Sequence, residues 1–218
     1  MGFPQGLVVP SPIDFLERVE RATVVVAHPD DEALMFGGTM RTLADAGAEV
    51  TVVSVSDGGQ GRGVVFHEAC SRLGATGRIL GLNAGSIALD LSLIAEMDEV
   101  LSSNEPDVVF THGGATPQHQ DHLVVRNALE LSLARWTPSV LALGGEVPVG
   151  RTNWRPQVFV DITSNLPTKV EAVELYAELG MRQYLTRDAV RTRAAYWGLL
   201  GYGSTAIHAE AFDLLVWT

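Results

Sequence analysis

Three apolar runs rich in β-branched residues set the strongest limit on what this chain can fold into. They cover residues 22–27 (ATVVVA), 48–56 (AEVTVVSVS) and 107–112 (DVVFTH). Apolar side chains at successive positions suit strands that are buried on both faces, as the strands of a parallel sheet are. The first run stops at His-Pro-Asp-Asp, the second at a glycine-rich segment and the third at a polar loop. The chain therefore favours a sheet of buried parallel strands whose ends carry polar groups.

Helical patterns separate these strands, so that the order strand, loop, helix repeats along the chain. We expect further strands at 78–82, 139–143, 156–163 and 212–217, and helices at 32–46, 64–74, 90–103, 123–136, 167–180 and 186–199. This order predicts an α/β fold of the Rossmann-like, doubly wound type, with a mostly parallel sheet, helices on both faces and a C-terminal strand–helix extension. Because no linker or repeat is visible, we expect one domain over residues 1–218, with an irregular N-terminal arm at 1–13.

Charge and cysteine content exclude several classes of partner. The formal net charge of −11, without a cluster of Lys and Arg, argues against nucleic-acid binding. No apolar run reaches the roughly 20 residues that span a bilayer, and the N-terminus lacks a signal peptide pattern, so we expect no membrane insertion and a cytoplasmic protein. Cys70 is the only cysteine, so a metal must be held by His and carboxylate groups. Homo-oligomerisation is left open.

Two polar clusters follow predicted strands: AHPDDE at 27–32 and HQDH at 119–122. The carboxyl ends of parallel strands are where open α/β sheets bind ligands. Imidazole and carboxylate groups together suit a divalent metal, and two His with one carboxylate and an open position is the usual catalytic zinc arrangement. Alternatively, the aspartates of the first cluster cap a helix, and the second cluster is a polar loop before a helix.

The double motif resembles the LmbE/PIG-L family of zinc-dependent N-deacetylases. AHPDDE after a first strand, and TH followed by HxDH after the strand in PDVVFTH, carry the resemblance, which extends over roughly residues 20–215. The resemblance implies an enzyme that removes acetyl groups from N-acetylglucosamine-type substrates, including precursors of glycosylphosphatidylinositol, mycothiol and bacillithiol. The expected partner is thus a small N-acylated molecule.

The resemblance also implies roles for individual residues. The implied metal ligands are His28, Asp31 and His122. The implied metal is Zn²⁺, with Fe²⁺ or another divalent ion as the alternative. Asp30 is the implied general base that takes a proton from the attacking water. His119 is implied to stabilise the oxyanion or to protonate the leaving amine, and Asp121 to orient and charge His119.

The chain departs from the family in two loops that concern the substrate. After the second strand, 56–62 reads SDGGQGR and lacks the glutamate of the usual T-x-G-E-x-G, while 82–85 reads LNAG and lacks the aspartate of the usual L-P-D-G. Arg62 and Asn83 remain as candidate substrate-binding residues in these loops. His112 is a third candidate, which either lines the pocket or supports the second cluster.

We therefore expect a hydrolase that removes an N-acyl group, normally acetyl, from an amino sugar or its conjugate by means of a metal-activated water. Because these two loops differ from those of the family, an alternative hypothesis is an amidase that acts on a non-sugar acylated amine such as a natural-product intermediate. A metal-stabilised binding protein without turnover is the third reading. A nucleotide-binding Rossmann protein is excluded, because the first strand is followed by HPDDE rather than by a glycine fingerprint.

Overall fold

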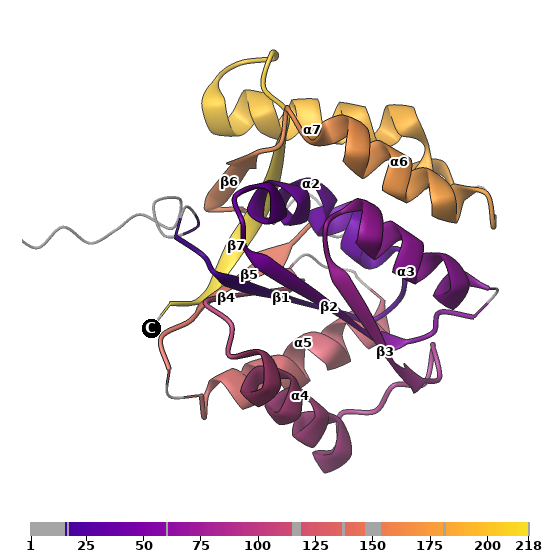
Figure 1. Ribbon diagram of the computed structural model, residues 1–218, viewed down its shortest axis with the longest axis vertical. Helices are drawn as coiled ribbons and strands as arrows, with labels where there is room; N and C mark the ends of the chain where they lie inside the picture. The colour runs from indigo at the N-terminus through magenta and orange to yellow at the C-terminus, as the bar shows by residue number, and fades with distance from the viewer. Residues whose placement is uncertain are drawn as a thin grey trace, which may run out of the picture.

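A seven-stranded sheet runs through the centre of the molecule in the order β3-β2-β1-β4-β5-β7-β6 (Figure 1). The computed structural model describes residues 16, 18–59, 61–114, 119–136, 138–146, 154–180 and 182–217. The arm expected at 1–13 lies outside the described residues. The strands are β1 (Arg21–Val26), β2 (Glu49–Ser56), β3 (Thr76–Leu82), β4 (Val108–His112), β5 (Leu141–Gly145), β6 (Val158–Asp161) and β7 (Ala209–Trp217).

The first five strands of the chain pair in parallel, and the last strand runs against them. β1 pairs with β2 and β4, β2 with β3, and β4 with β5, all in parallel, whereas β7 is antiparallel to both β5 and β6. The prediction of an α/β fold with a mostly parallel sheet is therefore confirmed. β1 and β4 lie side by side, so the polar residues that follow them emerge at the same edge of the sheet.

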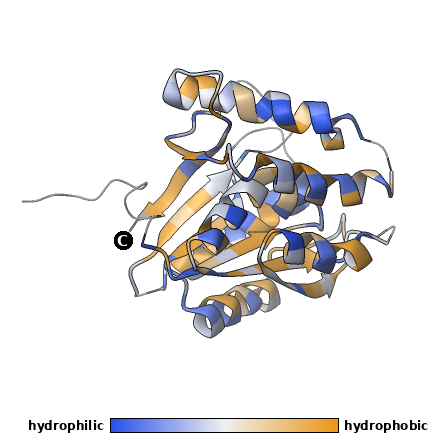
Figure 2. Ribbon diagram, turned by 45° about the horizontal axis from the view of Figure 1, so that its top comes forward, coloured by the Kyte–Doolittle hydropathy of each residue, from blue (hydrophilic) through white to orange (hydrophobic). Residues whose placement is uncertain are grey.

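Helices cover both faces of the sheet. The α-helices are α2 (Asp31–Asp45), α3 (Arg62–Arg72), α4 (Leu91–Asn104), α5 (Gln120–Leu133), α6 (Leu166–Ala177) and α7 (Arg187–Tyr202), and η1 (Gln183–Leu185) is a short 3-10 helix. One face carries α2 and α3, with α6 and α7 above them, and the other carries α4 and α5 (Figure 1). The strands between these layers are strongly apolar (Figure 2).

The two largest buried clusters of the described residues lie on opposite faces of the sheet. Alternate residues of one strand divide between them: Val24 and Val26 pack under α2, while Val25 packs under α4 and α5. Side chains of a strand point alternately to opposite faces, so a strand buried on both sides needs apolar residues at every position. The continuous apolar runs thus have their structural explanation.

Most element boundaries differ by a few residues from the sequence-based prediction, and two of these differences concern the site and the sheet edge. α5 begins at Gln120 rather than at 123, so Asp121 and His122 belong to its first turn and not to the preceding loop. β7 begins at Ala209 rather than at 212, because its first residues pair with β6. Among the described residues, none of the helices combines the length and apolarity that a membrane crossing requires.

Candidate active site

Two consecutive carboxylates at the start of α2, those of Asp30 and Asp31, point in different directions. Asp30 has a φ of 111°, a conformation that a residue with a side chain rarely adopts. Its backbone N–H donates to Oε2 of Glu32 at 3.0 Å, and its carbonyl accepts from the N–H of Leu34 at 3.0 Å. The carboxylate of Asp31 lies near histidines, whereas that of Asp30 lies near Arg62 at 3.1 Å. The strained backbone at Asp30 thus places the carboxylates of Asp30 and Asp31 in different surroundings.

The three residues expected to bind a metal lie together and are all buried. Oδ2 of Asp31 is 3.4 Å from Nδ1 of His28 and 3.3 Å from Nε2 of His122. Burial raises the pKa of the Asp31 carboxyl, but the charges and hydrogen bonds of the two histidines outweigh it and hold that pKa well below its usual value. The three side chains therefore place two nitrogen lone pairs and one carboxylate oxygen around a common point.

His119 ends the polar loop and caps α5. Its Nδ1 accepts from the backbone N–H of Asp121 at 3.2 Å. Nδ1 is therefore unprotonated, and the ring proton of the neutral imidazole is on Nε2. The side chain is about half exposed. Partial burial and the charge of His28 lower the pKa of His119, so the neutral form prevails near neutral pH.

The Asp121 carboxylate lies closer to His28 than to His119. Its Oδ2 is 2.8 Å from Nε2 of His28 and 3.7 Å from Nδ1 of His119, and it also accepts from the backbone N–H of Gly85 at 2.6 Å. Although burial raises its pKa, the Gly85 and His28 hydrogen bonds outweigh burial, so Asp121 is ionised. Asp121 thus lies within reach of His119, as predicted, but its hydrogen bond is made with His28. Ligand atoms of His28, His119 and Asp121 also lie within 4.8 Å of one another and form a second group that could hold a metal.

His112 lies behind His122 and has no exposed surface. The two rings stack with centroids 3.9 Å apart and an interplanar angle of 7°. Nε2 of His112 accepts from the backbone N–H of Ala27 at 2.9 Å. Burial and the charge of His122 hold the pKa of His112 well below its usual value, so it is neutral. The substrate-binding prediction for His112 does not fit this burial, and of the two roles considered the geometry favours support of His122.

Arg62 contacts the expected general base directly. Its Nη1 donates to Oδ2 of Asp30 at 3.1 Å, and its Nη2 donates to the carbonyl of Gly58. Gly58 has a φ of 68°, and a Cβ there would lie 2.9 Å from Cδ of Pro29, so the close approach of this loop requires glycine. Burial and the charge of Asp31 raise the pKa of Asp30 to about 7, although Arg62 opposes the shift.

Asn83 lies in an exposed loop next to the site. Its carbonyl accepts from the backbone N–H of Ser86 at 3.2 Å, which closes a tight turn. Gly85 of the same turn donates to Asp121, as described above. The loop therefore touches the site through its backbone, while the Asn83 residue is exposed at its rim.

Glu32 is a site residue that the sequence reading did not single out. It is fully buried, and its Oε1 accepts from the hydroxyl of Tyr176 at 2.5 Å, while Oε2 holds the backbone of Asp30. Burial raises the pKa of Glu32 to about 8. A glutamate directly before the apolar run ALMF was the available signal, because its position on α2 faces the core.

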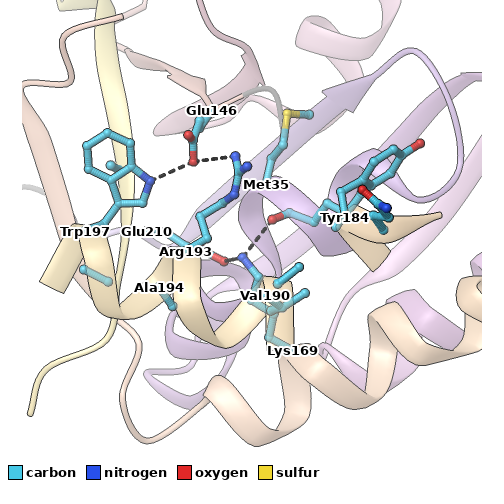
Figure 3. Close-up of a pocket in the computed structure, with 14 residues that line it drawn as sticks. Met35, Glu146, Lys169, Tyr184, Val190, Arg193, Ala194, Trp197 and Glu210 are labelled. Atoms are coloured by element: carbon cyan, nitrogen blue, oxygen red, sulfur yellow. Dashed lines mark hydrogen bonds and ion pairs between the residues drawn. The ribbon is translucent and has the colours of Figure 1, made fainter. Parts of the chain in front are cut away.

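A cavity of about 320 Å³ lies between α2, α7 and β7 (Figure 3). Two ion pairs line it, Lys169 with Glu210 at 2.5 Å and Arg193 with Glu146 at 2.9 Å. Nε1 of Trp197 also donates to Glu146 at 2.7 Å. The carboxylate of Glu210 is thus occupied by groups of the protein itself.

Comparison with known proteins adds a family to this geometry. The model of the family PIG-L, described as GlcNAc-PI de-N-acetylase, matches residues 23–132, half of the chain, which include both polar clusters. The chain is 29% identical to a 1D-myo-inositol 2-acetamido-2-deoxy-alpha-D-glucopyranoside deacetylase of Corynebacterium diphtheriae, over 49% of this chain and 50% of that protein. The chain thus spans about half the length of this curated relative.

Two solved structures share the fold over most of the chain. The N,N′-diacetylchitobiose deacetylase from Pyrococcus horikoshii superposes with a TM-score of 0.79 at 19% identity, over 97% of this chain and 87% of that one. The 4-carboxy-2-hydroxymuconate hydratase GalB from Pseudomonas putida KT2440 superposes with a TM-score of 0.77 at 19% identity, over 90% and 96%. These identities establish the fold and leave the reaction open, because the two enzymes catalyse different reactions. The match to the family model covers half of the chain and both polar clusters, and on this ground the chain belongs to the PIG-L family of deacetylases.

Proposed function

We propose that this chain is a metal-dependent hydrolase that removes an N-acyl group, normally acetyl, from an amino sugar or amino-sugar conjugate, and that residues 1–218 act as one domain. The opposed orientation of Asp30 and Asp31 carries the proposal. One carboxylate faces two histidines that can share a metal, and the other faces Arg62 with a pKa of about 7. A site that merely bound a metal would have no use for the second, strained carboxylate.

The donor set supports Zn²⁺ as the metal. Zinc bonds of about 2.0–2.1 Å in a tetrahedron place neighbouring ligand atoms about 3.3–3.4 Å apart. Oδ2 of Asp31 lies at such distances, 3.4 and 3.3 Å, from Nδ1 of His28 and Nε2 of His122. In the alternative group with His119, the 2.8 Å between His28 and Asp121 is a hydrogen-bond length, too short for two ligands of one ion. Fe²⁺ accepts the same donors.

Asp121 then supports the metal site indirectly, by orienting His28. His28 donates from Nε2 to Asp121, which leaves the lone pair of Nδ1 for a metal. Ligand histidines generally make such a hydrogen bond to a carboxylate, which fixes their tautomer and orientation. His112, stacked on His122, restrains the second histidine ligand in a similar way.

Asp30 supplies the proton transfers. When bound, the metal provides Lewis-acid activation of water and of the amide carbonyl. Asp30 accepts one proton from the attacking water as the new C–O bond forms. It returns this proton to the amide nitrogen as the C–N bond breaks, and the products are acetate and a free amine. A pKa of about 7 suits both steps, because a group that titrates near the working pH can accept and release a proton.

His119 stabilises the developing oxyanion as a neutral donor. Its Nδ1 is occupied by the backbone N–H of Asp121, so Nε2–H is the group available to the substrate. A pre-oriented donor of this kind contributes to catalysis because it is already in place when the charge develops. Arg62, which contacts Asp30, and Asn83, at the rim of the site, remain candidate contacts for the sugar.

Metal analysis and turnover of two variants test these assignments. Asp30→Asn should retain the bound metal and lose nearly all hydrolysis of N-acetyl substrates such as N,N′-diacetylchitobiose, measured as primary amine released. His122→Ala should lose the metal, measured by elemental analysis after desalting. His67→Ala, which changes an exposed histidine of α3, is the matched control and should change neither quantity.

Other outcomes would favour the competing functions. If Asp30→Asn empties the site, the roles of base and ligand are reversed. Hydrolysis of non-sugar N-acyl amines alone would favour the amidase reading. A metal-loaded protein that hydrolyses nothing in a broad N-acyl panel contradicts the proposal and leaves a binding protein, or an enzyme of another class on the same fold.

A further inference from the structure

Tyr176 of α6 reaches the start of α2 through a buried carboxylate. Its hydroxyl donates to Oε1 of Glu32 at 2.5 Å, and Oε2 of Glu32 accepts from the backbone N–H of Asp30 at 3.0 Å. Tyr176 is 2% exposed and Glu32 has no exposed surface, so both bonds are shielded from water. A chain of two hydrogen bonds thus joins a residue 144 positions away from Glu32 to the expected general base.

The backbone of Asp30 needs this support. It has a φ of 111° and a ψ of −30°, and a residue with a side chain keeps such a conformation only where neighbouring groups hold it. The angle φ describes rotation about the bond between N and Cα. Glu32 holds the N–H on one side of that bond, and Arg62 holds the carboxylate on the other. The two contacts together therefore fix the unusual angle.

Helix α6 in turn holds Glu32. A glutamate side chain rotates about several bonds, and Tyr176 anchors its second oxygen, Oε1. Lys169 lies seven residues before Tyr176 on the same face of α6, and it donates to the carbonyl of Leu34 at 2.8 Å. α6 thus binds the first turn of α2 at two points. Tyr176 lies outside residues 23–132, which the family model matches, so this contact comes from the rest of the chain.

The geometry points to Tyr176 as a positioning residue, which acts through Glu32 to keep the carboxylate of Asp30 beside Arg62 and away from the metal ligands. The inference rests on the proposed deacetylase function, in which Asp30 is the base. Without the hydroxyl of Tyr176, Glu32 no longer holds the N–H in one place, and Asp30 relaxes towards an ordinary backbone conformation. The base is then misplaced, which lowers kcat, whereas the metal ligands and the substrate contacts are unchanged.

Two variants interrupt the chain of hydrogen bonds at different points. Tyr176→Phe removes the hydroxyl and keeps the ring, and it should lower kcat for N,N′-diacetylchitobiose about 3- to 10-fold. Glu32→Met removes both acceptor oxygens at a similar side-chain length and should lower kcat about 10- to 100-fold. KM and the bound metal should change little in both variants. In Glu32→Gln the amide oxygen can accept from the Asp30 N–H and the NH2 group can bond to the Tyr176 hydroxyl, so this variant should recover most of the kcat that Glu32→Met loses.

Tyr202→Phe is the matched control, because the hydroxyl of Tyr202 on α7 donates to the carbonyl of Phe159 at 3.0 Å rather than to a residue of the site. It also removes one tyrosine hydrogen bond, and kcat should be unchanged. Hydrogen exchange of the Asp30 amide, followed by NMR in the metal-free protein, measures the contact without turnover. Exchange should be faster in Tyr176→Phe and Glu32→Met than in the native protein, and unchanged in Tyr202→Phe.

Three results would overturn the inference while leaving the deacetylase function intact. One is a Tyr176→Phe variant with a lower melting temperature but the native kcat, because the hydroxyl then serves stability alone. Another is a Glu32→Gln variant as inactive as Glu32→Met, which would mean that the charge of Glu32 matters rather than its hydrogen bonds. Loss of metal from Tyr176→Phe would show that the contact supports the ligand Asp31 instead. A native protein that hydrolyses no N-acetyl substrate would refute the deacetylase function itself, and this inference with it.

Discussion

The buried ion pair between Lys169 and Glu210 should hold α2 in its position. Nζ of Lys169 donates to Oε1 of Glu210 at 2.5 Å and to the carbonyl of Leu34 at 2.8 Å. The carboxylate of Glu210 accepts from the backbone N–H groups of Gly38 and Thr39, each at 2.8 Å. In a regular α-helix the Gly38 N–H pairs with the Leu34 carbonyl. Glu210 thus accepts from the Gly38 N–H, and Lys169 donates to the Leu34 carbonyl, although both partners lie outside the helix.

Replacing Lys169 with Met keeps the length of the side chain and removes its charge. Lys169 and Glu210 are 5% and 4% exposed, so the variant leaves a carboxylate buried without a cation. Loss of one partner of a buried pair costs about 3–5 kcal/mol of unfolding free energy. In a chain of this size each kcal/mol corresponds to about 2–4 °C, so the melting temperature should fall by about 10 °C.

Urea unfolding of the metal-free protein, followed by far-UV circular dichroism, measures this cost without a contribution from the metal. The double variant Lys169→Met with Glu210→Gln removes both charges and should cost about 1–3 kcal/mol less than the sum of the single changes. Arg41→Met, on the exposed side of the same helix where Arg41 pairs with Asp45, is the control and should cost less than about 1 kcal/mol. A cost below about 1 kcal/mol for Lys169→Met, or strict additivity in the double variant, would refute the reasoning.

Three further predictions concern the site and its support. Because Asp30 must be deprotonated to act as a base and has a pKa of about 7, kcat/KM should rise with pH up to about 7 and then level off. A bound dication can only lower this pKa, so a rise that continues well above that pH in a pH–rate profile would contradict the assignment. Asp121→Asn should weaken metal binding about 10- to 100-fold in a chelator competition, because it weakens the restraint on His28. An unchanged metal affinity with a reduced kcat would instead point to a role in orienting another group. Gly38→Ala should lower the melting temperature, because the added Cβ would lie 2.6 Å from the side chain of Ile162, and a thermal melt indistinguishable from that of the native protein would show that this contact relaxes freely.

Much of the fold was predictable because burial dictates composition. Strands covered on both faces need apolar residues at every position, so 22–27 and 107–112 were recognisable without any alignment. The placement of two polar clusters at one edge of the sheet followed from the parallel order of these strands. The location of the candidate site was also visible, since few structural demands place HPDDE and HQDH after buried strands.

The contacts between loops could not be predicted in the same way. The bond from His28 to Asp121 joins residues 93 positions apart, and that from Arg62 to Asp30 joins residues 32 apart. Such pairs depend on loop conformations that no periodic pattern encodes. Lys169 illustrates the limit most clearly, because a lysine is ordinarily exposed and here its burial follows from Glu210 on a distant strand.

The unusual backbone of Asp30 has a consequence for any effort to make this protein more robust. A φ of 111° costs a residue with a side chain about 1–3 kcal/mol, whereas glycine adopts it freely. Asp30→Gly should therefore give a protein that melts at a higher temperature and lacks the proposed general base. The same backbone conformation that separates the carboxylates of Asp30 and Asp31 lowers the stability of the protein. A screen for thermal stability alone would therefore select inactive variants at this position.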